Sequence, residues 1–232
     1  MNTRTTLRAR TRTCTTSRLT RVIGLVGAAA AGLVACSSLP SSAELDMQAK
    51  AMMRAGFRDE GITKVDRLDQ DLANQVCSEL LGAQPSEARS KAIEVANLAT
   101  VKAPADGKYL GDFKKGEALA QDGRGMTWTD RSADTSANGG NCYNCHQIGK
   151  AEISYGTIGP SLYNYGKIRG VSDPAGEAAK PIVEYTWGKL YNARAYNACS
   201  NMPRFGHQKL LNEAQLKDLM ALLLDPRSPV NQ

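Results

Sequence analysis

The side chains with the clearest capacity for chemistry lie in five consecutive residues, Cys142-Tyr143-Asn144-Cys145-His146. Two cysteines separated by two residues and followed by a histidine form the attachment sequence of a c-type haem. At this spacing both thiols can reach the two vinyl groups of one haem, and the adjacent imidazole can ligate the iron. The sequence therefore predicts one covalently bound haem c, with Cys142 and Cys145 as the attachment points and His146 as an iron ligand.

Cysteine pairs at this spacing also occur in thioredoxin-like redox centres and in zinc sites. A zinc site would need a second pair of ligands at short spacing, and the chain has only one further histidine, His207. The residues around the pair also lack the βαβ pattern of a thioredoxin. Haem attachment is therefore the preferred interpretation.

A second iron ligand is expected on the opposite side of the haem. Met202 precedes a proline, and this step favours an extended loop that presents the thioether to the iron. His207 and Cys199 are alternatives, which would give bis-histidine or thiolate ligation. Met126 lies in a predicted loop and Met220 in a predicted helix. Loop context and the Met-Pro step together favour Met202.

The first 35 residues have the composition of an export signal. Six arginines precede an uncharged apolar run over 22–35, which is too short to span a bilayer comfortably. The run ends at Leu33-Val34-Ala35-Cys36, which resembles a bacterial lipobox, so we expect Cys36 to be lipidated and the protein to be a membrane-anchored periplasmic lipoprotein. The alternative is cleavage at Ser41-Ser42-Ala43, which would release a soluble periplasmic protein.

The positive charge of the chain belongs to this leader. The whole sequence has 29 basic and 23 acidic residues, a net charge of +6, and six of the basic residues but no acidic residue lie in the leader. The remaining residues therefore carry 23 charges of each sign. This balance gives no support for nucleic-acid binding.

The cysteines also report on the compartment, because disulfides persist outside the cytoplasm. Of the six cysteines, Cys14 leaves with the leader, Cys36 is lipidated or removed, and two are used by haem. Cys77 and Cys199 remain, and we predict a disulfide between them, with two separate buried thiols as the alternative. The bond would tie the N-terminal region to the loop near Met202.

Hydrophobic periodicity predicts an all-α chain. Residues 36–106 are expected to form a helical extension, with Ser86 as a helix N-cap. Helices are also expected over 112–121, over 181–192 and from a capping box at Asn212–Gln215 onward, the last packing on the first. The composition of residues 122–140 predicts a surface loop, and we expect Trp128 to pack within it. The apolar stripes expected to face a core in the extension are Leu68, Leu72, Val76 and Leu80, and Ile93, Ala96, Leu98 and Val101.

Several segments together resemble class I c-type cytochromes, and a finer set resembles the SoxX subunits of thiosulfate-oxidising cytochromes. The class I features are Gly111-Asp112, Lys115-Gly116, the haem motif, Gly159-Pro160-Ser161-Leu162 and Met202-Pro203-Arg204-Phe205. The features that resemble SoxX are Gly139-Gly140-Asn141, Tyr163-Asn164-Tyr165-Gly166, and the segments 187–192 and 197–207. The resemblance implies an all-α class I cytochrome c-like domain over 107–232. It also implies that the carbonyl of Pro160 accepts a hydrogen bond from Nδ1 of His146.

The resemblance further implies a role. A SoxX subunit forms a heterodimer with a SoxA-type cytochrome, and the complex, an L-cysteine S-thiosulfotransferase, couples thiosulfate oxidatively to a cysteine of the SoxYZ carrier. The sulfur chemistry is assigned to the SoxA haem, and SoxX passes the electrons to a downstream cytochrome c. This chain would then be an electron-transfer subunit without catalytic residues. The alternatives are a free-standing monohaem carrier that serves a terminal oxidase and a structural lipoprotein that anchors a haem complex.

Overall fold

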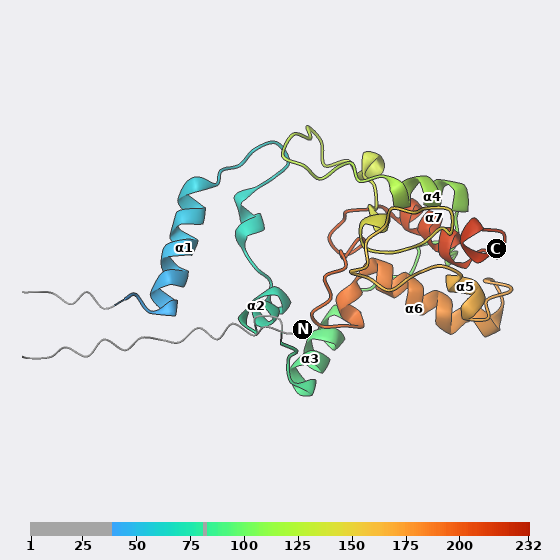
Figure 1. The fold of residues 1–232 in the computed structure, drawn as a ribbon, viewed down its shortest axis with the longest axis horizontal. Helices are drawn as coiled ribbons and strands as arrows, with labels where there is room; N and C mark the ends of the chain where they lie inside the picture. Colours follow the sequence, from blue (N-terminus) through green and yellow to red (C-terminus); the bar gives the residue numbers. More distant parts are fainter. Residues whose placement is uncertain (1–38, 81–82) are drawn as a thin grey trace, which may run out of the picture. The chain divides into compact units, whose positions relative to one another are not determined.

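The computed structural model describes residues 39–80 and 83–232. Within these residues the regular structure is helical, and the one β-type pairing is an isolated bridge between Glu60 and Thr63 (Figure 1). The predicted all-α class is thus confirmed for the described part of the chain. The leader, which includes Cys14, and the predicted lipidation site Cys36 lie outside the described residues. The domain boundary at 106/107 stays a prediction.

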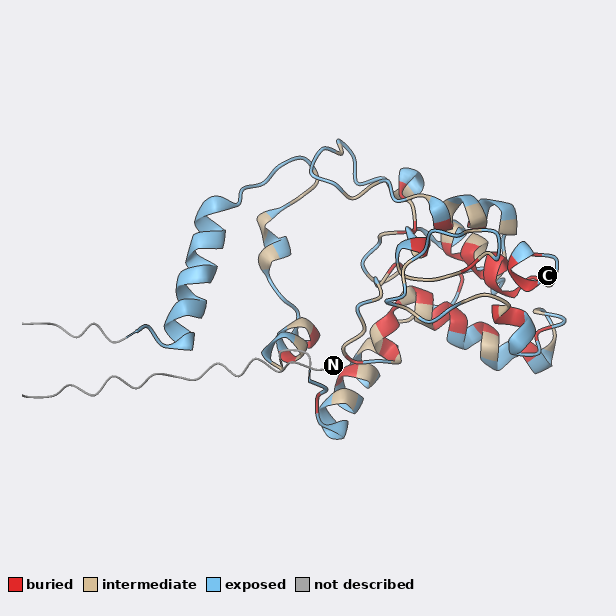
Figure 2. Cartoon of the chain, viewed as in Figure 1, coloured by how far each residue is buried: buried red, intermediate tan, exposed pale blue. Residues whose placement is uncertain are grey.

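The described residues of the N-terminal extension form three α-helices and one 3₁₀ turn. They are α1 (Ser42–Gly56), η1 (Val65–Leu68), α2 (Leu72–Glu79) and α3 (Glu87–Leu98). Helix α1 has no buried residue (Figure 2). The side chains of Asp71 and Ser86 accept hydrogen bonds from backbone amides at the starts of α2 and α3, so both helices begin at N-caps, as predicted for Ser86. None of the described helices is long and apolar enough to cross a membrane.

The apolar stripes predicted for the extension are only partly buried. Val76 and Ile93 join Ala73 and Ala198 in a small core. Leu72 and Leu98, by contrast, are 71% and 48% exposed, so their predicted core positions are wrong. The reason is geometric: this core is only a few residues wide, so each short helix buries a narrow stripe and the rest of its apolar surface faces water.

Four α-helices form the remaining domain: α4 (Phe113–Gln121), α5 (Tyr165–Ile168), α6 (Lys180–Tyr191) and α7 (Glu213–Leu224). The capping box predicted before α7 is present, because Asn212 and Gln215 exchange side-chain and backbone hydrogen bonds. Pro181 lies in the first turn of α6, where its missing N–H costs nothing. Short 3₁₀ turns lie between these helices at Thr135–Ala137, Cys142–Asn144, Glu177–Ala179 and Ala193–Ala195, and one more follows α7 at Pro229–Asn231.

Helices α4 and α7 pack against each other, as predicted (Figure 1). A Cβ atom at Gly116 would lie 2.1 Å from the carbonyl oxygen of Asp218, so the close approach of the two helices requires glycine at this position. Helix α7 is buried along most of its length, from Leu216 to Leu224. Its inward side chains form one wall of the cavity described below.

The segment 122–140 is a loop, interrupted by the 3₁₀ turn Thr135–Ala137. Its base is closed by two hydrogen bonds, from Gly139 N to Arg124 O (2.9 Å) and from Asn141 N to Asp122 O (2.9 Å). The expected packing of Trp128 is wrong, because this side chain is 64% exposed. The closed base brings the end of α4 next to the start of the Cys-x-x-Cys-His segment.

Candidate haem-attachment site

The attachment segment is a single tight turn. Asn141 has a left-handed φ of 51°, and the 3₁₀ turn Cys142–Asn144 follows at once. The amides of Cys145 and His146 both donate to the Cys142 carbonyl, at 3.1 and 2.9 Å. Neither Cys142 nor Cys145 is in a disulfide. Burial raises the pKa of the Cys142 thiol to about 12, so this thiol is protonated at neutral pH before any attachment.

The imidazole of His146 is oriented by one hydrogen bond. Its Nδ1 lies 2.7 Å from the carbonyl oxygen of Pro160. A carbonyl can only accept, so Nδ1 carries the hydrogen and Nε2 keeps its lone pair for a metal. The neighbouring Gly159 leaves no space for a side chain, because a Cβ there would lie 2.1 Å from Cε1 of His146. The Gly-Pro segment thus holds the ring in the ligating tautomer.

The hydroxyl of Tyr143 connects the attachment turn to two neighbouring segments. Its hydroxyl donates to Glu117 Oε1 at 2.8 Å and accepts from Gly149 N at 3.1 Å. Burial, followed by the hydrogen bond to the Glu117 carboxylate, raises the pKa of Tyr143 well above its usual value. The side chain therefore stays a neutral donor that connects α4 to the segment after the motif.

The attachment side chains open onto a cavity of about 530 Å³, a volume within the usual range of cofactor sites. Cys142, Cys145, His146 and Met202 all line it. The rest of its wall is mainly apolar and includes Ile148, Leu162, Tyr165, Leu190, Phe205, Leu219, Leu222 and Leu223. Two unpaired thiols, an imidazole with an available Nε2, a thioether and an apolar wall are the groups that a covalently attached haem requires. The residues present therefore fit haem c.

Among the candidates for a second ligand, Met202 is the one that lines the cavity with an available donor. Cys199 also lines the cavity, but its sulfur is bonded to Cys77. His207 is not among the lining residues; burial, with a further contribution from Arg204, lowers its pKa below the usual range. Met220 is fully buried in α7 and also does not line the cavity.

The loop that carries Met202 is closed at its downstream end by the amides of Gly206 and His207, which donate to the Tyr191 carbonyl at 3.1 and 3.0 Å. Within the loop, Ser200 Oγ accepts from Met202 N at 3.2 Å.

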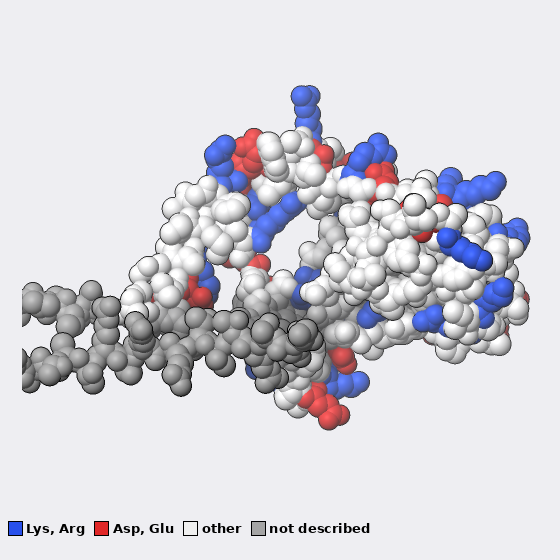
Figure 3. Space-filling view, viewed as in Figure 1, with Lys and Arg blue, Asp and Glu red and all other residues white. Residues whose placement is uncertain are grey.

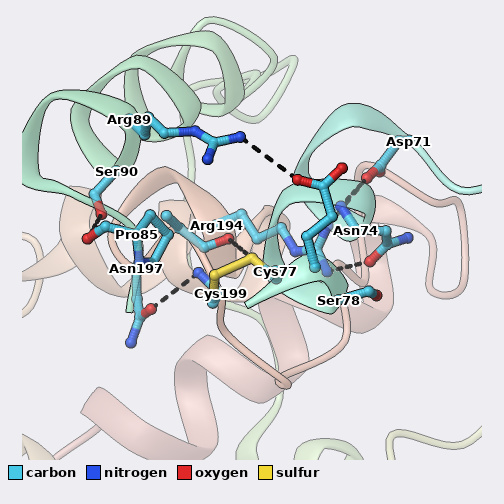
Figure 4. Close-up of a disulfide and its surroundings, with 12 residues drawn as sticks. Asp71, Asn74, Cys77, Ser78, Pro85, Arg89, Ser90, Arg194, Asn197 and Cys199 are labelled. Atoms are coloured by element: carbon cyan, nitrogen blue, oxygen red, sulfur yellow. Dashed lines mark hydrogen bonds and ion pairs between the residues drawn. A yellow bond between two sulfur atoms is a disulfide. The ribbon is translucent and has the colours of Figure 1, made fainter. Parts of the chain in front are cut away.

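A group of residues in the extension contacts this loop from outside (Figure 4). Cys77 of α2 forms a disulfide with Cys199. The Asp71 carboxylate pairs with both Arg194 and Arg204. Burial alone would raise the pKa of Asp71, but the Asn74 amide and Arg204 hold it below its usual range. Sequence reasoning missed this ion-pair group, because nothing in the spacing of these charged residues connects them.

Comparisons with known proteins agree with the site. Residues 113–225 match the family model described as cytochrome c. These residues include the attachment motif, the Gly-Pro segment and Met202. The chain is also similar to a protein of Aquifex aeolicus (strain VF5) described as an uncharacterized lipoprotein, with 32% identity over 212 residues that cover 87% of this chain and 94% of the relative.

Proposed function

We propose that this chain is a monohaem electron relay with His146 and Met202 as its iron ligands. Its residues 113–225 form a cytochrome c family domain, which implies a covalently bound haem c and a role in electron transfer. The observation that carries this proposal is the cavity whose wall holds two unpaired thiols, an oriented imidazole and a thioether. Cys142 and Cys145 would form the thioether links, which fix the haem in one orientation.

The residues around the site support a high potential. Haem supplies one-electron chemistry when bound, and a His/Met ligand pair raises its reduction potential. The Pro160 carbonyl keeps the His146 ring oriented. The apolar wall limits access of water, which disfavours the more highly charged oxidised state. These features suit a protein that accepts electrons from a donor of lower potential.

For the biological role, we favour the relay subunit of a thiosulfate-oxidising complex of the SoxAX kind. The support is the finer sequence resemblance, whose segments 187–192 and 197–207 carry nine of the residues that line the cavity, Met202 among them. A SoxA-type cytochrome would be the stable partner, the SoxYZ carrier a transient one, and a downstream cytochrome c the acceptor. On the face seen in Figure 3, lysine and arginine side chains are more prominent than acidic ones over the haem domain, and this distribution would steer an acidic redox partner.

For the location, we propose a periplasmic protein anchored through lipid on Cys36. The name of the Aquifex relative and the lipobox-like sequence before Cys36 support this. A short lipid-linked segment would keep the relay at the membrane surface, where electrons enter respiratory chains.

One protein preparation tests both the covalent attachment of haem and the proposed biological role. The chain, produced with haem-maturation proteins, should keep its haem through acid–organic extraction, and Cys142→Ala with Cys145→Ala should abolish that retention. Haem that extracts freely from the wild-type protein would refute covalent attachment.

The same protein, mixed with a SoxA-type partner, SoxYZ and thiosulfate, should co-purify with the partner and become reduced in a thiosulfate-dependent manner. A chain that carries haem but neither binds the partner nor accepts its electrons would instead be a free-standing carrier.

A further inference from the structure

The loop that carries Met202 is held from outside the cytochrome c domain. We propose that Asp71 is a positioning residue for the iron ligand: together with the Cys77–Cys199 disulfide, it clamps the Met202 loop in the ligating position. This inference rests on the proposed ligation of the iron by Met202. Asp71 and Cys77 both lie outside residues 113–225, which match the family model.

The first half of the clamp is an ion-pair group. Asp71 Oδ2 lies 2.6 Å from Nη1 of Arg204, two residues after Met202. Asp71 Oδ1 lies 3.2 Å from Nη1 of Arg194. Nη2 of the same arginine donates to Oδ1 of Asn74. The arginine side chains are only 12% and 13% exposed. The Asp71 side chain is 39% exposed. Because both cationic partners are nevertheless withdrawn from water, these charge-assisted bonds are stronger than a pair in which both groups are exposed.

The second half of the clamp is covalent. Cys199 lies three residues before Met202 and is bonded to Cys77. Cys77 is on α2, whose N-cap is Asp71. The two attachments therefore bracket Met202 in the sequence, and both lead to the same two-turn helix. Because one rigid helix holds the loop on both sides of Met202, the loop has few conformations in which the thioether is away from the iron.

Helix α2 is itself fixed to the domain, so it can act as the rigid side of the clamp. Ala73 and Val76 of α2 share a small core with Ile93 of α3 and with Ala198. Next to this core, the fully buried Asn192 donates from Nδ2 to Asn97 Oδ1 and Thr100 Oγ1, at 3.0 and 2.9 Å. The segment between α6 and Met202 is therefore packed against the extension before it reaches the haem cavity.

The experiment measures how often the thioether leaves the iron. Imidazole can bind ferric haem only when the sixth position is open, so its apparent affinity is proportional to the open fraction. Asp71→Asn removes the charge but keeps an N-cap of equal quality for α2. Loss of two charge-assisted bonds should tighten imidazole binding about tenfold or more. Arg204→Gln, which leaves Asp71 in place as the N-cap, should act in the same direction.

Two further variants serve as controls. Asp71→Glu should restore weak imidazole binding at least in part, because the carboxylate is kept. Asp69→Asn, two residues away, removes a carboxylate that pairs with the exposed Arg54 instead of the loop, and should leave imidazole affinity unchanged. Denaturant unfolding of the same samples, without imidazole, separates loop opening from a general loss of stability.

The outcomes distinguish the clamp from the ligation on which it rests. Met202→Ala should give the tightest imidazole binding; no change in that variant would refute Met202 as the ligand. If Met202→Ala tightens binding while Asp71→Asn and Arg204→Gln bind imidazole as weakly as wild type, the clamp is refuted. It is also refuted if Asp71→Asn lowers unfolding stability but leaves imidazole affinity unchanged, because the residue would then be merely structural.

Discussion

Removal of the Cys77–Cys199 bond tests how the extension contributes to stability. The cysteines are 122 residues apart in sequence, so the bond closes a loop that contains the haem attachment segment. In the chain-entropy model, a loop of this length restricts the unfolded chain by about 5 kcal/mol at 25 °C. For a chain of this size, that corresponds to a fall in Tm of about 10–20 °C. We expect Cys77→Ala with Cys199→Ala to fold but to lose stability of this order.

Guanidinium unfolding, followed by circular dichroism, measures this loss. Both cysteines are replaced, because substitution of Cys77 alone would leave a free thiol at Cys199, which lines the haem cavity. The slope of unfolding free energy against denaturant should rise, since an unfolded chain without the cross-link exposes more surface. A loss below about 1 kcal/mol with an unchanged slope would refute the loop-entropy reasoning, because it would show that the cross-link hardly restricts the unfolded chain.

Three further predictions concern the site. Gly159→Ala places a Cβ where the His146 ring lies, 2.1 Å from Cε1, and should displace the imidazole and yield high-spin haem in absorption spectra; an unchanged low-spin spectrum would contradict the packing. Met202→Ala should abolish the weak ferric band at the red edge of the visible spectrum and lower the midpoint potential while haem stays attached; a persistent band would assign the ligand elsewhere. The pKa of Asp71 is lowered in the folded protein, so its stabilisation is present above its unfolded pKa of about 3.9 and is lost as pH falls through the lower folded value; urea unfolding of Asp71→Asn and wild type should differ at neutral pH and converge in acid.

The haem site could be predicted from the sequence because its chemistry is local. Two thiols and an imidazole within five residues leave few interpretations, and the structure places all three side chains on the wall of one cavity. Helix starts were similarly accessible, since Ser86 and Asn212 cap helices through side chains a few residues from the amides that they bind. The Cys77–Cys199 pairing followed from a count of the remaining cysteines.

The sequence could not indicate the contacts between distant residues. Asp71 and Arg204 look like ordinary surface charges, and only the fold brings them within 2.6 Å of each other. Periodicity also failed in the extension, because Leu72 lies in an apolar repeat but its side chain is 71% exposed. Hydrophobic spacing indicates which face a helix can bury, whereas the size of the adjoining core decides how much of it is buried.

The state of the four cysteines has a consequence for the order of assembly. Cys77–Cys199 is oxidised, whereas Cys142 and Cys145 must reach haem as thiols. In a chain exported from its N-terminus, Cys77 enters the oxidising compartment first and meets both haem cysteines before Cys199 has emerged. A bond from Cys77 to either would block a thioether and would have to be exchanged through attack by another thiolate. In a chain exported as proposed, early attachment of haem to Cys142 and Cys145 would remove both wrong partners, so the timing of maturation would favour the native cross-link.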